Sequence, residues 1–285
     1  MKKLRIAVQK SGRLHEDSLK LLKDAGIQVD NGRQQLKAAS KNFPLEIFYL
    51  RNSDIPQYLL DGVVDTAIIG ENELIEKGGD IRIEEKLGFS KCRLSLAVPQ
   101  GATYSGIESL DGKKIATSFP NTVRNYFREK GYSAEIHVIN GSVEIAPNIG
   151  LADGIADLVS SGSTLFQNNL KEAEVILESQ AVLAVSPTIS NERAEVLDKL
   201  RFRIQAVLRA RSYKYILMNI PNDKLDSIIE LLPGMKSPTV LPLAIEGWSS
   251  IHTVIQEEQF WNVIDELKNR GAEGILVSPI EKMIL

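Results

Sequence analysis

The first two thirds of the chain alternate short apolar segments with amphipathic ones, and this alternation restricts the fold more than any other feature. Leu4–Val8, Leu45–Leu50 and Lys114–Thr117 are typical of buried strands. Between the first two, Ser11–Ala25 carries apolar residues at helical spacing and is closed by Gly26. Strands that alternate with helices in this way predict an α/β sheet.

Two stretches of this region repeat one pattern. Asp65 and Gly70 have the same spacing as Asp157 and Gly162, and the helix predicted before each pair ends at a glycine. The repetition predicts two related lobes facing each other across a cleft, where open α/β sheets bind ligands at the carboxyl ends of their strands. Chance recurrence of a common helix–strand unit would give the same pattern. Lobe I would span about residues 1–91 and 181–211, and lobe II about 92–180.

The composition changes after a long helix that is predicted over Asn191–Ala210. Residues 214–278 then have the predicted order strand, helix, strand, strand, helix, strand, which is the ferredoxin-like βαββαβ unit. Because 285 residues exceed what most single cores support, this unit can form a separate domain. We expect a two-lobed region over residues 1–211 and a ferredoxin-like domain over residues 212–285.

Charge and composition exclude several classes of protein. With 34 Lys and Arg against 37 Asp and Glu, and no basic block, nucleic acid is not the expected partner. A single cysteine excludes an intrachain disulfide and fits a reducing cytosol. The three histidines lack metal-ligand spacing, which argues against a zinc or iron site. No stretch resembles a signal peptide or a membrane span, so we expect a cytoplasmic protein without membrane contact.

Small polar residues join a predicted strand to a predicted helix at Ser160–Thr164. The strand is the apolar run Ile155–Val159, and the helix restarts at Leu165. Such a turn presents backbone N–H groups and hydroxyls at the positive end of a helix dipole, which favours phosphate binding. Taken alone, a Ser/Gly turn of this kind is more often an ordinary loop.

Three carboxylates, Glu144, Asp153 and Asp157, precede this turn. Glu144 lies on a helix predicted to begin at an N-cap Ser142 and to reach about Asn148. Carboxylates beside a phosphate-binding turn suit the hydroxyls of a sugar, or the Mg²⁺ that accompanies a polyphosphate.

The spacing of this segment is similar to the signature of the ATP phosphoribosyltransferase family, which carries out the first step of histidine biosynthesis. Further matching motifs follow in order along nearly the whole chain: Gln9–Leu14, Asp54–Pro56, Asp61–Asp65, Ile69–Asn72, Cys92–Leu94 and Pro279–Met283. The resemblance to the long form of the family implies a periplasmic-binding-protein-like catalytic region and a ferredoxin-like, ACT-like regulatory domain. It also implies transfer of the phosphoribosyl group of phosphoribosyl pyrophosphate to N1 of the ATP adenine, with release of pyrophosphate.

The resemblance further implies roles for individual residues. Ser160, Ser161, Gly162, Ser163 and Thr164 would bind the ribose 5-phosphate, and Asp153 and Asp157 would bind ribose hydroxyls or Mg²⁺, as would Glu144 with less support. Lys10, Arg13 and Arg51 would contact phosphate groups, and Glu71 the sugar or the adenine. On the residues alone, Lys10 and Arg13 also fit a solvated turn, and Arg51 a surface ion pair. No protein nucleophile is expected, because adenine N1 itself attacks.

Feedback inhibition by histidine, and a homodimer in equilibrium with a homohexamer, are also implied by the resemblance. The histidine site would include Thr239 and Gly274, with Asn219 at a position that varies in the family. A ferredoxin-like module that serves only assembly is the alternative.

Three other assignments compete with this one. Two-lobed sheets also occur in solute-binding proteins and in effector domains of regulators, but the chain shows neither an export signal nor a helix-turn-helix. Porphobilinogen deaminase has a similar two-lobed fold, yet Cys92 lacks the setting expected for tethering its cofactor. A catalytically silent homologue is disfavoured by the intact loop and its acidic neighbours.

Overall fold

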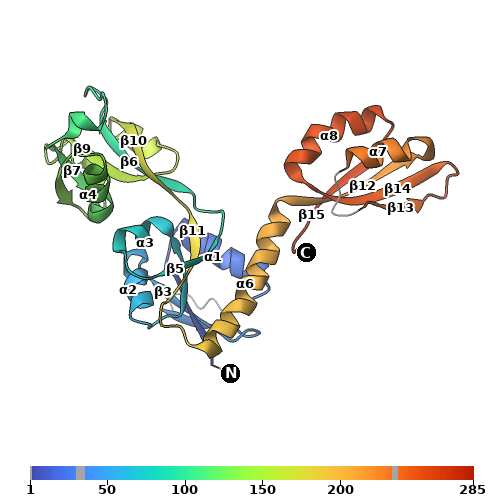
Figure 1. Cartoon of the computed structure of the whole chain (residues 1–285), viewed down its shortest axis with the longest axis horizontal. Coiled ribbons are helices and arrows are strands. Elements are labelled where there is room, and N and C mark those ends of the chain that lie inside the picture. Colours follow the sequence, from blue (N-terminus) through green and yellow to red (C-terminus); the bar gives the residue numbers. More distant parts are fainter. Residues whose placement is uncertain (1, 30–35, 233–236) are drawn as a thin grey trace. The chain divides into compact units, whose positions relative to one another are not determined.

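The computed structural model describes residues 2–29, 36–232 and 237–285, which fold into two compact units (Figure 1). The larger unit contains the chain up to Lys23 together with Ile27–Asp198, and the smaller one contains Asp24–Gly26 and Lys199–Leu285. The division falls inside helix α6 (Asn191–Arg211), whereas the expected boundary followed residue 211.

The first sheet of the larger unit has the strand order β2-β3-β1-β4-β11-β5. Its strands are β1 (Leu4–Gln9), β2 (Lys37–Ala39), β3 (Leu45–Leu50), β4 (Thr66–Gly70), β5 (Arg82–Lys86) and β11 (Ala181–Val185). β1 is parallel to both β3 and β4, and β11 is antiparallel to β4 and β5. β11 is buried along its whole length because helices or loops cover both faces of this part of the sheet. The helices that follow its strands are α1 (Arg13–Asp24), α2 (Ile55–Leu60) and α3 (Glu71–Lys77).

The second sheet has the strand order β10-β6-β9-β7-β8. Its strands are β6 (Cys92–Pro99), β7 (Lys114–Thr117), β8 (Glu135–Val138), β9 (Gly154–Val159) and β10 (Leu170–Ser179), and its helices are α4 (Pro120–Glu129) and α5 (Ser163–Gln167). β7 is parallel to β8 and β9, while β6 is antiparallel to β9. The order β8-β7-β9-β6 therefore repeats the order β3-β1-β4-β11 of the first sheet. This shared topology agrees with the internal repeat expected from the sequence.

One predicted helix near the loop is wrong, and another is present but short. The helix expected from Ser142 is a single 3₁₀ turn at Val143–Ile145, because Ser142 itself has a left-handed φ of 50° and makes no side-chain cap. Pro147 then prevents a regular continuation, since it has no N–H to donate. The helix expected from Leu165 onward is only the short α5, after which the chain pairs with β6 as the long strand β10.

The smaller unit confirms the predicted ferredoxin-like order. Its strands β12 (Tyr213–Pro221), β13 (Thr239–Pro242), β14 (Trp248–Gln256) and β15 (Glu273–Pro279) form one sheet in the order β13-β14-β12-β15. Helices α7 (Leu225–Leu231) and α8 (Glu257–Asn269) pack on one face of it (Figure 1). Ile216, Met218 and Ile220 are fully buried beneath these helices, whereas Tyr215 and its alternate neighbours along β12 face the other side.

A buried carboxylate joins three segments of the larger unit. Asp65, just before β4, accepts hydrogen bonds from Arg5 Nε and Nη2 at 3.1 and 2.9 Å and from the backbone N–H of Arg5 at 2.8 Å. Arg193 Nη1, at the start of α6, donates to the same carboxylate at 3.1 Å. The bonds with Asp65 raise the pKa of the Arg5 guanidinium. β1, β4 and α6 are thereby fixed to one another.

Replacing Asp65 by alanine would remove the buried carboxylate that the Arg5 and Arg193 guanidinium groups share. We expect a loss of roughly 3 kcal/mol in the free energy of unfolding, the usual cost of removing one partner from a buried ion pair. Urea unfolding followed by circular dichroism measures it. Asp61→Ala is the matched control, because Asp61 is exposed and its side chain accepts a hydrogen bond from Gln57 Nε2, one turn away on α2, at 2.8 Å. Equal losses for the two variants would contradict this role of Asp65.

Candidate functional site

The structure brings the predicted residues of lobe I together at one sheet edge. Lys10, Arg51 and Glu71 directly follow β1, β3 and β4, which run parallel side by side. Arg13 begins α1 next to Lys10 and lies 3.9 Å from Asp17. Lys10, Arg13 and Arg51 are exposed, so all three cations are available to a ligand at this edge.

The loop Ser160–Thr164 lies at the corresponding edge of lobe II, directly after β9. Gly162 has a φ of 80°, which allows the chain to turn sharply from the strand into α5. Ser161 Oγ and Ser163 Oγ lie 3.0 Å apart, and the Ser163 N–H points to Ser161 Oγ at 3.5 Å. The N–H groups of a helix's first turn lack intrahelical acceptors, so the loop has donors to offer an anion.

Asp157 and Glu144 lie near this loop, and each is partly buried. Burial raises the pKa of the Asp157 carboxyl, the hydrogen bond from the Leu158 N–H lowers it, and the negative charge of Glu144 raises it further. Glu144 is therefore close enough to Asp157 to repel it. Two carboxylates that lie this close favour a cation or a hydroxyl donor between them.

Asp153 is not brought to the loop. It precedes β9, where its Oδ2 accepts the backbone N–H of Lys114 at 2.9 Å at the start of β7. β9 separates Asp153 from Ser160 by its whole length of six residues, or about 20 Å of extended chain. The structure thus groups Glu144 and Asp157 with the loop and leaves Asp153 at the opposite edge of the sheet.

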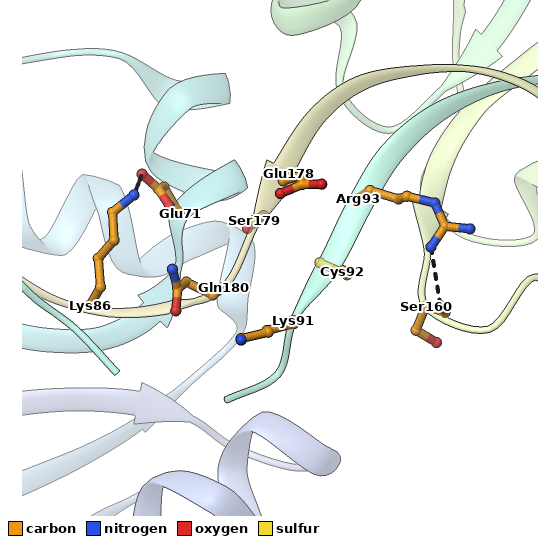
Figure 2. Close-up of a pocket in the computed structure, with 9 residues that line it drawn as sticks. All are labelled: Glu71, Lys86, Lys91, Cys92, Arg93, Ser160, Glu178, Ser179 and Gln180. Carbon is orange, nitrogen blue, oxygen red and sulfur yellow. Dashed lines mark hydrogen bonds and ion pairs between the residues drawn. The ribbon is translucent and has the colours of Figure 1, made fainter. Parts of the chain in front are cut away.

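A cavity of about 420 Å³ lies where the chain crosses between the two sheets (Figure 2). It is lined by Glu71, Lys86, Lys91, Cys92, Arg93, Ser160, Glu178, Ser179 and Gln180. Lys86 Nζ pairs with Glu71 at 3.3 Å, and Arg93 Nη1 donates to the Ser160 carbonyl oxygen at 3.3 Å. Burial raises the pKa of the Cys92 thiol, so this cysteine is not an activated nucleophile.

Sequence reasoning assigned no role to Lys86, Lys91 or Arg93. The motif that contains Cys92 and Arg93 contributed only to the family resemblance. The two lysines lie on either side of the connection from β5 to β6, which the sequence pattern did not predict. Their positions follow from the pairing of β5 with β11 and of β6 with β10, strands that come much later in the chain. Asn72 was also missed: its Oδ1 accepts from Ser179 Oγ at 2.8 Å beside the cavity.

In the smaller unit, the three residues expected to bind histidine lie on one sheet, Asn219 and Gly274 on the adjacent strands β12 and β15 and Thr239 on β13 at the opposite edge. Asn219 on β12 pairs with Glu273 on β15, and its Nδ2 lies 3.4 Å from where a Cβ on Gly274 would be. Thr239 is on the edge strand β13, opposite His252 of β14. His252 Nδ1 lies 2.6 Å from Tyr215 Oη, on the sheet face that α7 and α8 leave uncovered.

Residues 51–206 match the sequence model of the family described as ATP phosphoribosyltransferase (HisG), and residues 210–282 match that of the HisG C-terminal domain. The chain belongs to the ATP phosphoribosyltransferase family. It is therefore a transferase of histidine biosynthesis, and the resemblance found in the sequence is confirmed.

Full-length relatives agree with this membership. The chain is 55% identical over 282 residues to the ATP phosphoribosyltransferase of Bacteroides thetaiotaomicron, covering 99% of this chain and 100% of the relative. It is 53% identical over 281 residues to that of Cytophaga hutchinsonii, covering 99% and 98%. A solved ATP phosphoribosyl transferase (HisG:HisZ) complex from Thermotoga maritima superposes with a TM-score of 0.64 at 30% identity, over 72% of this chain and 98% of that one. Among the residues that the structure describes, no helix combines the length and apolarity needed to cross a membrane.

Replacing Asp157 by asparagine should stabilise the fold at neutral pH. In the folded state the pKa of Asp157 lies above its ordinary value of 3.8. Ionisation of Asp157 therefore destabilises the fold, and this loss of stability develops as the pH rises from 3.8 through the folded-state pKa. Asparagine keeps an oxygen for the Leu158 N–H but carries no charge. We expect a higher Tm than wild type at pH 7 and a difference that shrinks as the pH approaches 3.8.

Asp153→Asn is the control for this measurement, because Asp153 is exposed at the far end of the same strand. Differential scanning fluorimetry across a pH series measures both variants. A Tm for Asp157→Asn at or below the wild-type value at pH 7 would contradict the proposed desolvation of this carboxylate.

Proposed function

We propose that the chain transfers the phosphoribosyl group of phosphoribosyl pyrophosphate to N1 of the ATP adenine and releases pyrophosphate. The observation that carries this proposal is the meeting of the Ser160–Thr164 loop and a cation-lined cavity at one crossover, in a member of this family. The loop binds the 5-phosphate through backbone N–H groups and hydroxyls. Lys86 and Lys91 line the same cavity and can interact with the remaining negative charge.

The chemistry needs positioning and charge stabilisation more than a reactive side chain. Adenine N1 attacks C1 of the ribose as the bond to pyrophosphate breaks, so the ribose gains positive charge and the leaving group gains negative charge. The Asp157 carboxylate near the ribose stabilises the first, and the cations of the cavity stabilise the second. Lys10, Arg13 and Arg51 on the edge of lobe I contact the phosphates of ATP, and Glu71 faces the sugar or the adenine.

Mg²⁺ fits this site as an ion carried by the substrate. No group of three or more acidic, histidine or cysteine side chains in the described part of the chain could hold a metal alone. Mg²⁺ characteristically binds one or two carboxylates together with phosphate oxygens and water. Asp157 and Glu144 supply that number at the loop, and the ion would neutralise charge on the leaving pyrophosphate.

Histidine inhibition and assembly belong to the same proposal. Asn219 and Thr239 lie on the uncovered face of the C-terminal sheet, beside the polar pair Tyr215 and His252. Leu276, on the same sheet, is 61% exposed, which suits burial against another copy. We infer that histidine binds on this face and acts by biasing a homodimer–homohexamer equilibrium. Any such effect requires different affinities of histidine for the two states.

The reaction is tested with purified chain, ATP, phosphoribosyl pyrophosphate and Mg²⁺. We expect release of pyrophosphate together with the absorbance of a new nucleotide, and neither in the absence of one substrate. Asp157→Asn should lower kcat/KM roughly tenfold to a hundredfold, the range for losing a hydrogen bond to a charged group. Asp153→Asn should keep near-normal activity, because it lies at the opposite edge. Absence of product from folded wild-type protein would refute the proposed reaction.

The regulatory proposal is tested by adding histidine to the same assay. Histidine should inhibit the wild type, and Thr239→Ala should weaken inhibition while leaving uninhibited turnover unchanged. Ser237→Ala, just outside β13, serves as the control. Light scattering with and without histidine reports the assembly. Full activity at millimolar histidine would leave the C-terminal domain with an assembly role alone.

A further inference from the structure

Arg93 occupies the point where three strands meet the beginning of the loop. It is the second residue of β6, opposite Val159 of β9 on one side and Glu178 of β10 on the other. Because Val159 ends β9, the Arg93 side chain emerges beside Ser160, the first residue of the loop. Figure 2 shows its guanidinium directed at the Ser160 carbonyl.

The guanidinium is held in a fixed orientation by Glu172. Arg93 Nε and Nη2 each donate to one carboxylate oxygen of Glu172 at 2.5 Å, which is the bidentate geometry that fixes an arginine plane. The remaining nitrogen, Nη1, donates to the Ser160 carbonyl oxygen at 3.3 Å. The arginine therefore joins β10 to the start of the loop through bonds on both sides of one rigid group.

Glu172 is itself positioned by the sheet. Its Oε1 accepts Ser95 Oγ at 2.7 Å, and Ser95 is fully buried on β6. Two irregularities in the pairing of β10 with β6, at Glu172/Glu174 and Val175/Leu177, bring Glu172 opposite Ala97. Ala97 and Arg93 point to the same face of β6, so Glu172 shares that face with Arg93. Bulges commonly redirect side chains in this way next to functional sites.

Loop geometry, rather than added charge, is what this arrangement controls. Glu172 neutralises Arg93, so the pair contributes little net charge to the neighbouring cavity. The bond to Ser160 instead fixes the carbonyl at the point where the chain turns from β9 into the loop. The direction of the following N–H groups depends on that peptide plane.

We propose that Arg93, oriented by Glu172, is a positioning residue that sets the loop in the conformation that binds the 5-phosphate of phosphoribosyl pyrophosphate. This inference rests on the proposed function, because it assigns Arg93 to one substrate of that reaction. It requires that loss of the Arg93–Glu172 pair weaken the binding of phosphoribosyl pyrophosphate and leave the binding of ATP unchanged, because the expected contacts of ATP lie on lobe I.

The test measures KM for each substrate, kcat and Tm for Arg93→Gln, Arg93→Lys and Glu172→Gln. Arg93→Gln should raise KM for phosphoribosyl pyrophosphate roughly tenfold, with KM for ATP within about twofold of wild type. Arg93→Lys keeps the charge but loses the fork, so it should rescue little of this defect. The matched control is Arg82→Gln, because Arg82 forms a comparable pair with Glu84 at 2.8 Å on an exposed strand of the other sheet.

Glu172→Gln separates positioning from charge. The variant keeps the arginine and removes a negative charge, so a purely electrostatic role predicts a lower KM for phosphoribosyl pyrophosphate. A positioning role predicts a higher one, because the guanidinium is released from its fixed orientation. A lower or unchanged KM in this variant would overturn the inference, as would equal rises in both KM values accompanied by a lower Tm.

Failure of the inference and failure of the proposed function give different results. Unchanged KM values in Arg93→Gln with an active wild type reject the positioning role and leave the reaction intact. A wild type that binds phosphoribosyl pyrophosphate in calorimetry without forming product rejects the reaction. The role of Arg93 is then decided by the Kd of the same variants for that compound, which should rise by the same factor.

Discussion

The chain crosses between its first two sheets twice, from β5 to β6 and from β10 to β11, and the two crossings are hydrogen-bonded to each other. The position of the residues that line the cavity depends on these crossings. β10 pairs with β6 in the second sheet and, after Gln180 alone, the chain enters the first sheet as β11 (Figure 1). The other crossing, between β5 and β6, is hydrogen-bonded to this one. Ala181 N–H donates to the Phe89 carbonyl at 3.0 Å, and Gly88 N–H donates to Gln180 Oε1 at 3.1 Å. The cavity at these crossings is therefore lined by residues from segments that are hydrogen-bonded to each other.

The crossings also explain why charged residues from distant parts of the chain converge. β6 and β11 each run antiparallel to the central parallel strands, so they begin or end at the edge where β4 and β9 finish. Consequently Arg93 bonds to Ser160, Lys86 pairs with Glu71, and Glu178 lines the same cavity. The cations and the small-residue loop are brought together by strand direction, which is a property of topology more than of any one motif.

The sequence predicted most of the fold and part of the site. Apolar runs located the central strands, because burial on both faces leaves a continuous signal, and β3 and β7 have the expected limits. β10 was missed because its many charged residues lie at a sheet edge and hide the strand pattern. The same limit applies to Asp153: proximity in sequence to Asp157 suggested a shared role, yet a strand places its two ends far apart. Partners separated by eighty residues, such as Arg93 and Glu172, leave no periodic signal.

Two carboxylates near the loop, Asp157 and Glu172, have pKa values shifted in opposite directions. Asp157 is partly desolvated and repelled by Glu144, so its ionised form is costly until a cation or a positively charged ribose is present. Glu172 is the opposite case, because bonds from Arg93 and then Ser95 lower the pKa of its carboxyl and keep it ionised. The charge of Asp157 is thus left for the substrate to neutralise, whereas the charge of Glu172 is neutralised by Arg93, which it holds beside the loop. A transferase without a protein nucleophile needs both kinds, since its rate depends on where charge is placed and on how firmly the binding groups are held.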